Sequence, residues 1–402
     1  MSVSLSTPLK IGNKAAPNRI VAQPMECNNA DADGNPTDLT FERYRRLAEG
    51  EWGILTFEAL TVAYESRARK NQLGIAEKNR EGLGKLVESI RAIDDETLII
   101  FQINHSGNIS NGTFSRVVSP YPTGDPGVYV LTDDDLEEIK EQFATAARIA
   151  YEAGADGIDF KMCHGYLLGQ LLRPANTREG RYGGSFENRT RFFVETTQAI
   201  QKAVNDPDFL LGTRVSFYEG IIGGFGTTGP DEVAEDDTEP LTLMRMIEEM
   251  GYHFINVSAG IPVMTPQITR PTNHCPEGVF RHMAWTKKVK ETVKIPVIGS
   301  AYSYLRDGAN DLKEAVTGRK DFVTLAERNI ERGYVDMVGV GRQSLADPFF
   351  PRKILNGKTD EIRYCKICGG CASLLRGQGK VGCAFYDSFY KEELKRIRKK
   401  KS

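Results

Sequence analysis

The feature that most limits the fold is a regular alternation of short β-branched runs with amphipathic helical patterns along the chain. Turn-forming or polar residues bound each run, and a stretch with helical periodicity follows it. The predicted strands are Arg19–Gln23, Gly53–Glu58, Leu98–Ile103, Gly157–Lys161, Leu211–Phe217, Phe254–Ser258, Pro296–Gly299 and Met337–Val340. Eight β–α units within about 350 residues predict an α/β fold, a (β/α)8 TIM barrel. A doubly wound sheet is the alternative, but it seldom needs eight such units.

One helix and three long insertions support this reading. The segment Asp133–Ala153 has a helical pattern, with Thr132 as its expected N-cap and acidic residues in its first turn. Longer insertions occur at Asn104–Leu131, Gly169–Ser185 and Glu219–Glu239, and each follows a predicted strand. Loops after strands lie on the C-terminal face of a barrel, where active sites sit.

The pattern changes towards the C-terminus, where a terminal helix leads into a Gly/Cys loop and a charged helix, Tyr390–Lys400. We therefore expect a barrel over residues 1–350 and a small cysteine-rich extension over residues 351–402. The extension holds four of the seven cysteines: Cys365, Cys368, Cys371 and Cys383. Four thiolates at this spacing can surround one metal centre, and Gly369 and Gly370 let the backbone wrap it closely. Both an iron–sulfur cluster and a structural zinc fit these residues.

Charge and composition exclude several classes of protein. The formal net charge of −2 favours neither nucleic acid nor an anionic membrane as a partner. The N-terminal residues lack the layout of a signal peptide, and no run of about 18 apolar residues predicts a membrane span. An odd number of cysteines, most of them crowded together, differs from a secreted disulfide framework. We therefore expect a cytoplasmic enzyme.

Four polar residues cluster at the end of the fourth predicted strand. Alternate side chains of a strand share a face, so Asp159 and Lys161 are expected inside the barrel, with Lys161 nearer the mouth. His164 and Tyr166 follow on the loop above. Such donors can bind a carbonyl or carboxylate oxygen and deliver a proton. The alternative is structural: an ion pair between Lys161 and Asp159, with the His and Tyr packed.

A second set of residues describes a phosphate site. Gly299-Ser300 ends the seventh strand and Gly339-Val-Gly341-Arg342 ends the eighth, where this fold commonly holds a phosphate. Gln102 and Arg214 lie further round the mouth. Together they are typical of a flavin mononucleotide site, although turn glycines and surface-paired arginines would give the same residues.

One motif misleads. Gly224-Phe-Gly226-Thr-Thr-Gly229 matches G-x-G-x-x-G, but Pro230 and an acidic run follow it directly. Dinucleotide binding needs this motif between a strand and a helix. We therefore interpret it as a loop after the fifth strand.

The chain resembles the old yellow enzyme family of FMN oxidoreductases from about residue 7 to residue 350. The matching segments are PNRIVAQPMECNNADADGNPTD, EALTV, FQINHSG, HGYLLGQLLRPANTREGRYGGSFENRTRF and VGVGRQSLADP. The cysteines resemble those of the branch containing 2,4-dienoyl-CoA reductase and trimethylamine dehydrogenase, which carries a [4Fe-4S] cluster there.

The resemblance implies a function and a set of site residues. Reduced FMN gives hydride to the β-carbon of an alkene conjugated to a carbonyl, and Tyr166 protonates the α-carbon. Lys161 and His164 would polarise the carbonyl. The implied FMN contacts are Pro24, Met25, Ala59, Gln102 and Arg214, with Ser300, Gly341 and Arg342 around the phosphate.

Three positions depart from the family pattern. Lys161 replaces a common histidine, which suggests a carboxylate or another anionic acceptor. Glu26 replaces a small residue beside the flavin, where it would either pair with Lys161 or tune the flavin potential. Two residues, where some relatives have three, separate Cys368 from Cys371, so the geometry of the cluster differs.

The longest members of this branch continue into FAD- and NAD-binding domains, whereas this sequence ends at Ser402. We expect the electrons to come from a separate reductase or flavodoxin-like protein docked near the cluster, or directly from NAD(P)H. An ene-reductase acting on an unsaturated acid, thioester or ketone is the leading hypothesis. An amine dehydrogenase and a barrel subunit that serves electron transfer are the alternatives. Homo-oligomers are common in this family, but no feature of the sequence fixes an interface.

Overall fold

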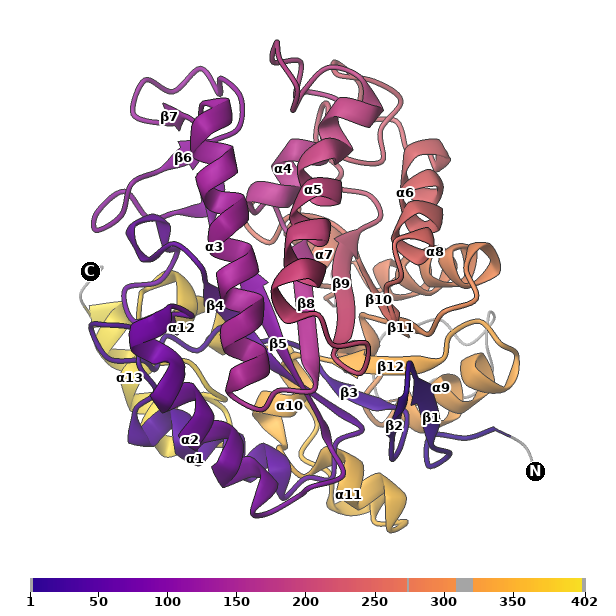
Figure 1. Ribbon diagram of the computed structural model, residues 1–402. Coiled ribbons are helices and arrows are strands. Elements are labelled where there is room, and N and C mark those ends of the chain that lie inside the picture. Colours follow the sequence, from indigo (N-terminus) through magenta and orange to yellow (C-terminus); the bar gives the residue numbers. More distant parts are fainter. Residues whose placement is uncertain (1–2, 273–274, 309–320, 400–402) are drawn as a thin grey trace.

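Eight parallel strands close into a barrel at the centre of the computed structural model, which describes residues 3–272, 275–308 and 321–399 (Figure 1). The strands follow one another round the barrel in chain order, and the last pairs with the first. They are β3 (Ile20–Ala22), β4 (Ile54–Thr61), β5 (Leu98–Asn104), β8 (Gly157–Met162), β9 (Leu210–Ser216), β10 (Phe254–Ser258), β11 (Val297–Gly299) and β12 (Met337–Val340). Each coincides with a predicted strand to within a few residues, so the predicted TIM barrel is confirmed.

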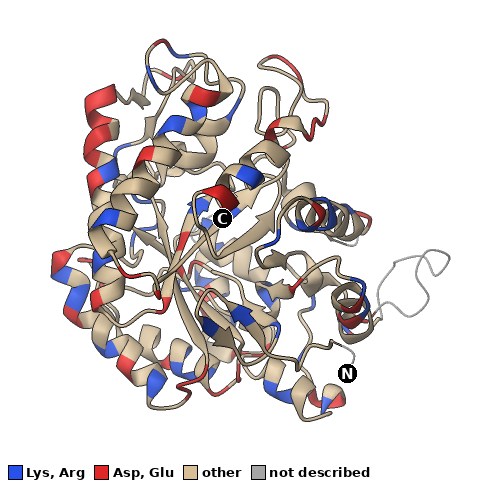
Figure 2. Cartoon of the chain, turned by 45° about the vertical axis from the view of Figure 1, so that its right-hand side comes forward, with Lys and Arg blue, Asp and Glu red and all other residues tan. Residues whose placement is uncertain are grey.

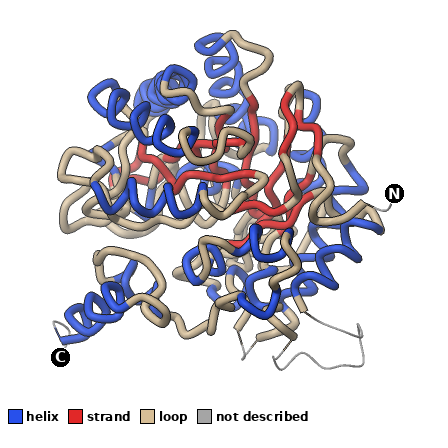
Figure 3. The backbone as a smooth tube through the Cα atoms, turned by 90° about the horizontal axis from the view of Figure 1, so that it is seen from below, coloured by secondary structure: helices blue, strands red, loops and turns tan. Residues whose placement is uncertain are grey.

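Helices follow the strands and cover the outside of the barrel (Figures 1 and 3). The longer ones are α1 (Asp38–Ala48), α2 (Arg80–Arg91), α3 (Asp133–Glu152), α5 (Phe186–Val204), α6 (Thr238–Glu249), α8 (Gly278–Thr292) and α9 (Phe322–Glu331). Short helices are α4 (Leu167–Leu172), α7 (Pro266–Thr269), α10 (Arg342–Ala346) and α11 (Phe350–Leu355). Lys, Arg, Asp and Glu are interspersed over the outer helices (Figure 2). Every described helix is too short or too polar to cross a membrane.

Helix α3 shows how the sequence directs this layer. The Thr132 side chain accepts a hydrogen bond from the Asp135 backbone N–H, which satisfies one of the free donors of the first turn. Leu136, Ile139 and Phe143 recur at helical spacing and are buried. The apolar face of α3 therefore packs inward, beside α5.

A hairpin covers the end of the barrel at which the strands begin. Its strands, β1 (Leu9–Ile11) and β2 (Lys14–Ala16), pair antiparallel. Ile11 and Ala16 form one buried cluster with the first residues of the barrel strands, namely Val21, Ile54, Leu98, Ile100, Leu210, Phe254, Ile298 and Met337. The sequence analysis missed this hairpin, as it missed the two-residue strands β6 (Val118–Ser119) and β7 (Tyr129–Val130). The hairpin leaves the C-terminal ends of the strands as the open face.

The C-terminal segment packs beside the first loops of the barrel. It contains α12 (Gly370–Arg376) and α13 (Ser388–Lys399), drawn in yellow near α1 in Figure 1. The predicted charged helix corresponds to α13, and its last predicted residue, Lys400, lies outside the described residues. Leu374, Val381 and Ile397 form a small buried cluster with Cys27, and the Val381 N–H donates to the Cys27 carbonyl at 2.9 Å. The segment therefore adds a wall beside the open face.

The G-x-G-x-x-G sequence lies in the loop between β9 and α6, as predicted. The loop is held by its own contacts, because the Phe225 N–H donates to the Glu219 carboxylate at 3.1 Å. These glycines lie within the loop and not at the start of α6, unlike those of a dinucleotide-binding turn.

Candidate active site

A cavity opens at the C-terminal ends of the strands, and most of the predicted site residues line it. The segment after β3 contributes Pro24, Met25 and Glu26. The other predicted residues that line it are Gln102, Lys161, His164, Tyr166, Arg214, Ser300, Gly341, Arg342 and Cys371. Ala59 does not line the cavity: it is buried, next to an irregularity in the pairing of β4 with β5, and its carbonyl accepts from Gln72 at 2.9 Å.

Glu26 is the centre of a buried ionic network. Its Oε2 accepts from Arg69 Nε at 2.8 Å, and its Oε1 lies 3.5 Å from Lys161 Nζ. The Tyr166 hydroxyl donates to the same Oε1 at 2.5 Å. Burial alone would raise the pKa of the Glu26 carboxyl, but the charges of Arg69 and Lys161 and the hydrogen bonds outweigh it and bring this pKa to about 2. Glu26 therefore pairs with Lys161, one of the two roles considered for it.

Tyr166 remains a proton donor at neutral pH. Burial, and then the Glu26 charge, hold the pKa of its hydroxyl well above the usual value. Lys161 Nζ lies over the Tyr166 ring, 3.5 Å from its centroid. Burial lowers the pKa of Lys161, and the Glu26 charge opposes that shift. The ion pair between Lys161 and Asp159, which was the structural alternative, is not the one that forms: Asp159 instead accepts from Gln102 at 2.9 Å.

His164 is held by its backbone as well as by its side chain. Its φ of 64° lies in the left-handed region, which turns the chain sharply after β8. The backbone N–H donates to Ser216 Oγ at 3.2 Å, and Nε2 lies 2.8 Å from Ser258 Oγ. Burial, and then the charge of Arg214, lower the pKa of the imidazole well below its usual value. His164 is therefore neutral and can donate or accept one hydrogen bond towards the cavity.

The polar floor of the cavity is partly unsatisfied. Gln23 and Asn256 exchange two hydrogen bonds, at 2.9 and 2.7 Å. Arg214 contacts Ser258 Oγ and Ser300 Oγ only at 3.4 Å, and its buried Nε has no partner. Buried donors normally have acceptors. An acceptor-rich planar ring such as that of FMN would supply one here.

Two arginines lie at the end of the cavity where an anionic group would bind. Arg342 begins α10 and Arg270 directly follows α7, and each donates only to a backbone carbonyl, at 3.3 and 3.1 Å. Burial, and then the charge of Arg342, lower the pKa of Arg270, so the two guanidinium groups are neighbours. Among the described residues neither has an ion-pair partner. A Cβ on Gly341 would lie 2.8 Å from Met25 Sδ, so this position accepts only glycine without a shift. The donors fit a phosphate.

The cysteine loop borders the same cavity. Cys371 lines the wall, as do Ala372, Leu375 and Val381. All seven cysteines are free. Burial, and then the charge of Cys365, raise the pKa of Cys371 to about 11, and burial, with smaller contributions from Cys365 and Cys368, raises the pKa of Cys383. Within the described residues, no three His, Cys, Asp or Glu side chains converge on one ion. The four thiols thus share one neighbourhood.

Among the cavity residues that sequence reasoning missed, three are polar or charged side chains near the Tyr166 and phosphate ends. Arg69 and Arg270 lie on loops after β4 and β10, and Ser258 ends β10. Their position after strands was the available signal, but isolated arginines in loops are common on any surface.

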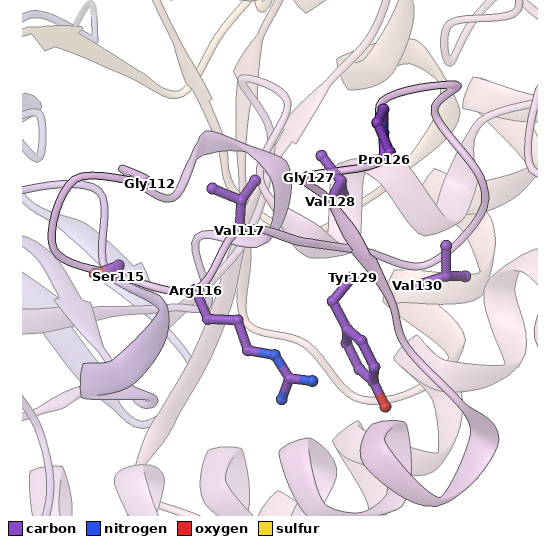
Figure 4. A pocket seen from close by; sticks show the side chains of 9 residues that line it. All are labelled: Gly112, Ser115, Arg116, Val117, Pro126, Gly127, Val128, Tyr129 and Val130. Atoms are coloured by element: carbon purple, nitrogen blue, oxygen red, sulfur yellow. The ribbon is translucent and has the colours of Figure 1, made fainter.

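A separate pocket lies in the insertion after β5. Arg116, Val117, Pro126 and Tyr129 are among its lining residues, and the Arg116 guanidinium lies 3.6 Å from the centroid of the Tyr129 ring (Figure 4). It shares no lining residue with the cavity described above. Since no buried reactive group lines it, we assign no chemistry to it.

Comparison with known proteins places the chain in a family. Residues 4–361 match the NADH:flavin oxidoreductase / NADH oxidase family. The chain is 33% identical to an NADH oxidase of Thermoanaerobacter brockii over 90% of its own length and 52% of that protein. It is 28% identical to a dimethylamine dehydrogenase of Hyphomicrobium sp. over 92% of its length and 48% of that protein. The chain therefore spans about half the length of these curated relatives.

Solved structures agree on the fold. A 2-naphthoyl-CoA reductase complex superposes with a TM-score of 0.80 at 24% identity, covering 97% of this chain and 58% of that one. An old yellow enzyme homologue from Zymomonas mobilis gives 0.68 at 20% identity, covering 88% and 93%. The predicted family resemblance is thus confirmed, and the chain belongs to the NADH:flavin oxidoreductase / NADH oxidase family.

Proposed function

We propose that the chain is an FMN-dependent ene-reductase for an anionic α,β-unsaturated carbonyl compound, such as an enoate. The charge of the cavity carries this proposal. Glu26 is the one carboxylate among the described lining residues, against five cationic side chains: Arg69, Lys161, Arg214, Arg270 and Arg342. This excess favours a phosphorylated cofactor together with an anionic substrate, and it disfavours a cationic amine.

The described residues fit FMN. Arg270 and Arg342 would hold the phosphate, with Ser300 beside them, and the unpaired Nε of Arg214 would face the polar edge of the ring. Bound and reduced, FMN supplies the hydride for the β-carbon. We propose no FMN contact for the side chain of Ala59, which lies outside the cavity wall.

The protein itself would hold the substrate and move one proton. Neutral His164 and cationic Lys161 would bind the carbonyl or carboxylate oxygen, which withdraws electrons from the double bond. Tyr166, kept protonated by its surroundings, would deliver its hydroxyl proton to the α-carbon. Cys163 is buried below them, and burial raises its thiol pKa to about 11, so it would take no part.

Cys365, Cys368, Cys371 and Cys383 would hold a [4Fe-4S] cluster. Each thiolate of such a cluster binds a different iron, so its ligands stand further apart than those of a single tetrahedral zinc. Four free thiols that share one neighbourhood supply the number of ligands that such a cluster needs, and free thiols also suit a reducing compartment such as the cytoplasm. The electron donor would be NAD(P)H, or a separate reductase or flavodoxin-like protein docked near the cysteines.

The main alternative is a flavin-dependent amine dehydrogenase, because one relative is a dimethylamine dehydrogenase. That reaction starts from an amine, which is cationic at neutral pH unless the site removes a proton. The cavity offers one carboxylate, Glu26, already shared by three donors. A subunit that only transfers electrons would need no proton donor in the cavity.

The test mixes photoreduced protein, without oxygen, with an enoate, its methyl ester and dimethylamine. Faster flavin reoxidation by the enoate than by its methyl ester supports the proposal, whereas equal or faster reoxidation by the ester rejects the anionic acceptor and reoxidation by neither rejects the ene-reductase. Flavin reduction of the oxidised protein by dimethylamine would establish the alternative. Tyr166→Phe should slow reoxidation by about 10²-fold or more, as loss of a general acid does. The matched control is Tyr252→Phe, which removes a buried hydroxyl that contacts Thr197 at 2.9 Å outside the cavity.

A further inference from the structure

Three charged side chains from segments far apart in the sequence surround Tyr166. Glu26 comes from the segment after β3, Arg69 from the loop after β4 and Lys161 from the end of β8. All are largely buried: the side chains of Glu26, Lys161 and Arg69 are 9%, 5% and 16% exposed. Because solvent screens buried charges only weakly, each charge of this group interacts strongly with the others.

The net charge of Glu26, Arg69, Lys161 and Tyr166 together is zero only after Tyr166 has lost its proton. While the tyrosine is protonated, two cations face one carboxylate. A tyrosinate would bring the group to neutrality. Cys163, the other titratable group near Tyr166, is held as a neutral thiol by burial. Arg69 and Lys161 therefore offset part of the cost of the negative charge that forms on Tyr166 when it delivers its proton, which is how preorganised charges assist a reaction.

The cysteine segment fixes the loop that carries Arg69. The Gln378 side chain accepts from the Lys70 N–H at 3.0 Å and donates to the Ala68 carbonyl at 3.2 Å, on either side of Arg69. Its own carbonyl accepts from Asn28 Nδ2 at 2.8 Å. Gln378 thus joins the two loops that hold the ion pair between Arg69 and Glu26, and it lies between Cys371 and Cys383 in the chain.

We propose that Glu26 and Arg69 are positioning residues for proton delivery by Tyr166, and that Gln378 holds Arg69 in that role. This rests on the proposed function. The O–H bond of Tyr166 breaks as a C–H bond forms at the α-carbon, the O–H electron pair stays on the phenolate, and water later restores its proton. Arg69 and Lys161 hold the phenolate charge, while Glu26 accepts the hydroxyl proton as a hydrogen bond and prevents early ionisation until the hydroxyl turns towards the α-carbon.

The first test measures ionisation of Tyr166 without turnover. Each variant is titrated by ultraviolet absorbance against the same variant carrying Tyr166→Phe, which isolates one tyrosinate. Glu26→Gln should lower the titration midpoint of Tyr166 by about one pH unit or more, and adding Arg69→Met should raise it again, because opposite charges are removed. The proposal is overturned if the two substitutions shift the Tyr166 midpoint in the same direction or do not shift it. Failure of the ene-reductase assignment would leave this titration unchanged, so the two failures are distinguishable.

The second test separates the half-reactions. Arg69→Met should slow flavin reoxidation by an enoate at least tenfold and leave flavin reduction within twofold, and Arg69→Lys should restore most of the rate. Gln378→Ala should slow reoxidation in the same direction at unchanged flavin content. The control is Arg178→Met: Arg178 has a similar exposure of 13%, and it bonds Asp133 and backbone carbonyls outside the cavity. Equal losses in both half-reactions, or the same loss in the control, would show a merely structural role, and this test decides alone if Glu26→Gln does not fold.

Discussion

The Glu26 network predicts how the stability of the protein depends on acid. In an unfolded chain a glutamate titrates near its usual value of 4.5, whereas the folded surroundings bring the pKa of Glu26 to about 2. A difference of roughly 2.5 units, at about 1.36 kcal/mol each, makes the ionised network worth roughly 3 kcal/mol. Because the folded pKa is depressed, this stabilisation is complete above the unfolded pKa and is lost as the pH falls towards 2. About 2 kcal/mol of it should disappear between about pH 5.5 and about pH 3.

The measurement compares wild type with Glu26→Gln, since glutamine cannot titrate. Urea unfolding at several pH values gives the difference in free energy of unfolding between the two proteins. We expect this difference to fall by about 2 kcal/mol between about pH 5.5 and about pH 3. A difference that does not change with pH would refute the reasoning. In an Arg69→Met background the fall should be smaller, because Arg69 is the largest of the opposing charges.

Three further predictions test other parts of the molecule. Lys161→Met should reduce turnover of an unsaturated acid about tenfold more than that of its methyl ester, and equal losses in steady-state kinetics would remove the idea of carboxylate selection. Arg270→Met and Arg342→Met should each weaken FMN binding about tenfold and leave riboflavin binding unchanged, as measured by flavin fluorescence; an equal effect on both flavins would place the phosphate elsewhere. Gly212→Ala should lower stability by about 1–3 kcal/mol in urea unfolding, because its Cβ would lie 2.0 Å from the Phe254 ring; an unchanged midpoint would contradict the packing.

The barrel could be predicted because each strand has its own local signal. Buried parallel strands are continuous apolar runs, and the helices between them have clear periodicity. The hairpin β1–β2 gave no such signal, since its strands have three residues each and form because they pack against the end of the barrel. Irregular elements of this kind depend on tertiary packing, which one sequence does not reveal.

The site could be predicted where residues end strands and not where they lie within loops. Lys161 and Arg214 have positions that the barrel dictates. Arg69 and Arg270 depend on loop conformations, which contacts such as those of Gln378 determine. Glu26 was noticed, but its partners come from two distant segments, and only the folded chain shows that Lys161 is shared between Glu26 and the Tyr166 ring.

The hairpin that covers the lower end of the barrel has a kinetic consequence. With Ile11 and Ala16 packed across that end, small molecules that reach the cavity must enter and leave at the opposite end. A nicotinamide donor and an unsaturated acceptor would therefore take turns at one entrance, giving ping-pong kinetics in which an excess of either inhibits by occupying the place of the other. Electrons that arrived through the cavity wall containing Cys371 would not compete with the acceptor for the entrance. Inhibition by excess donor thus distinguishes entry through the mouth from transfer through the wall.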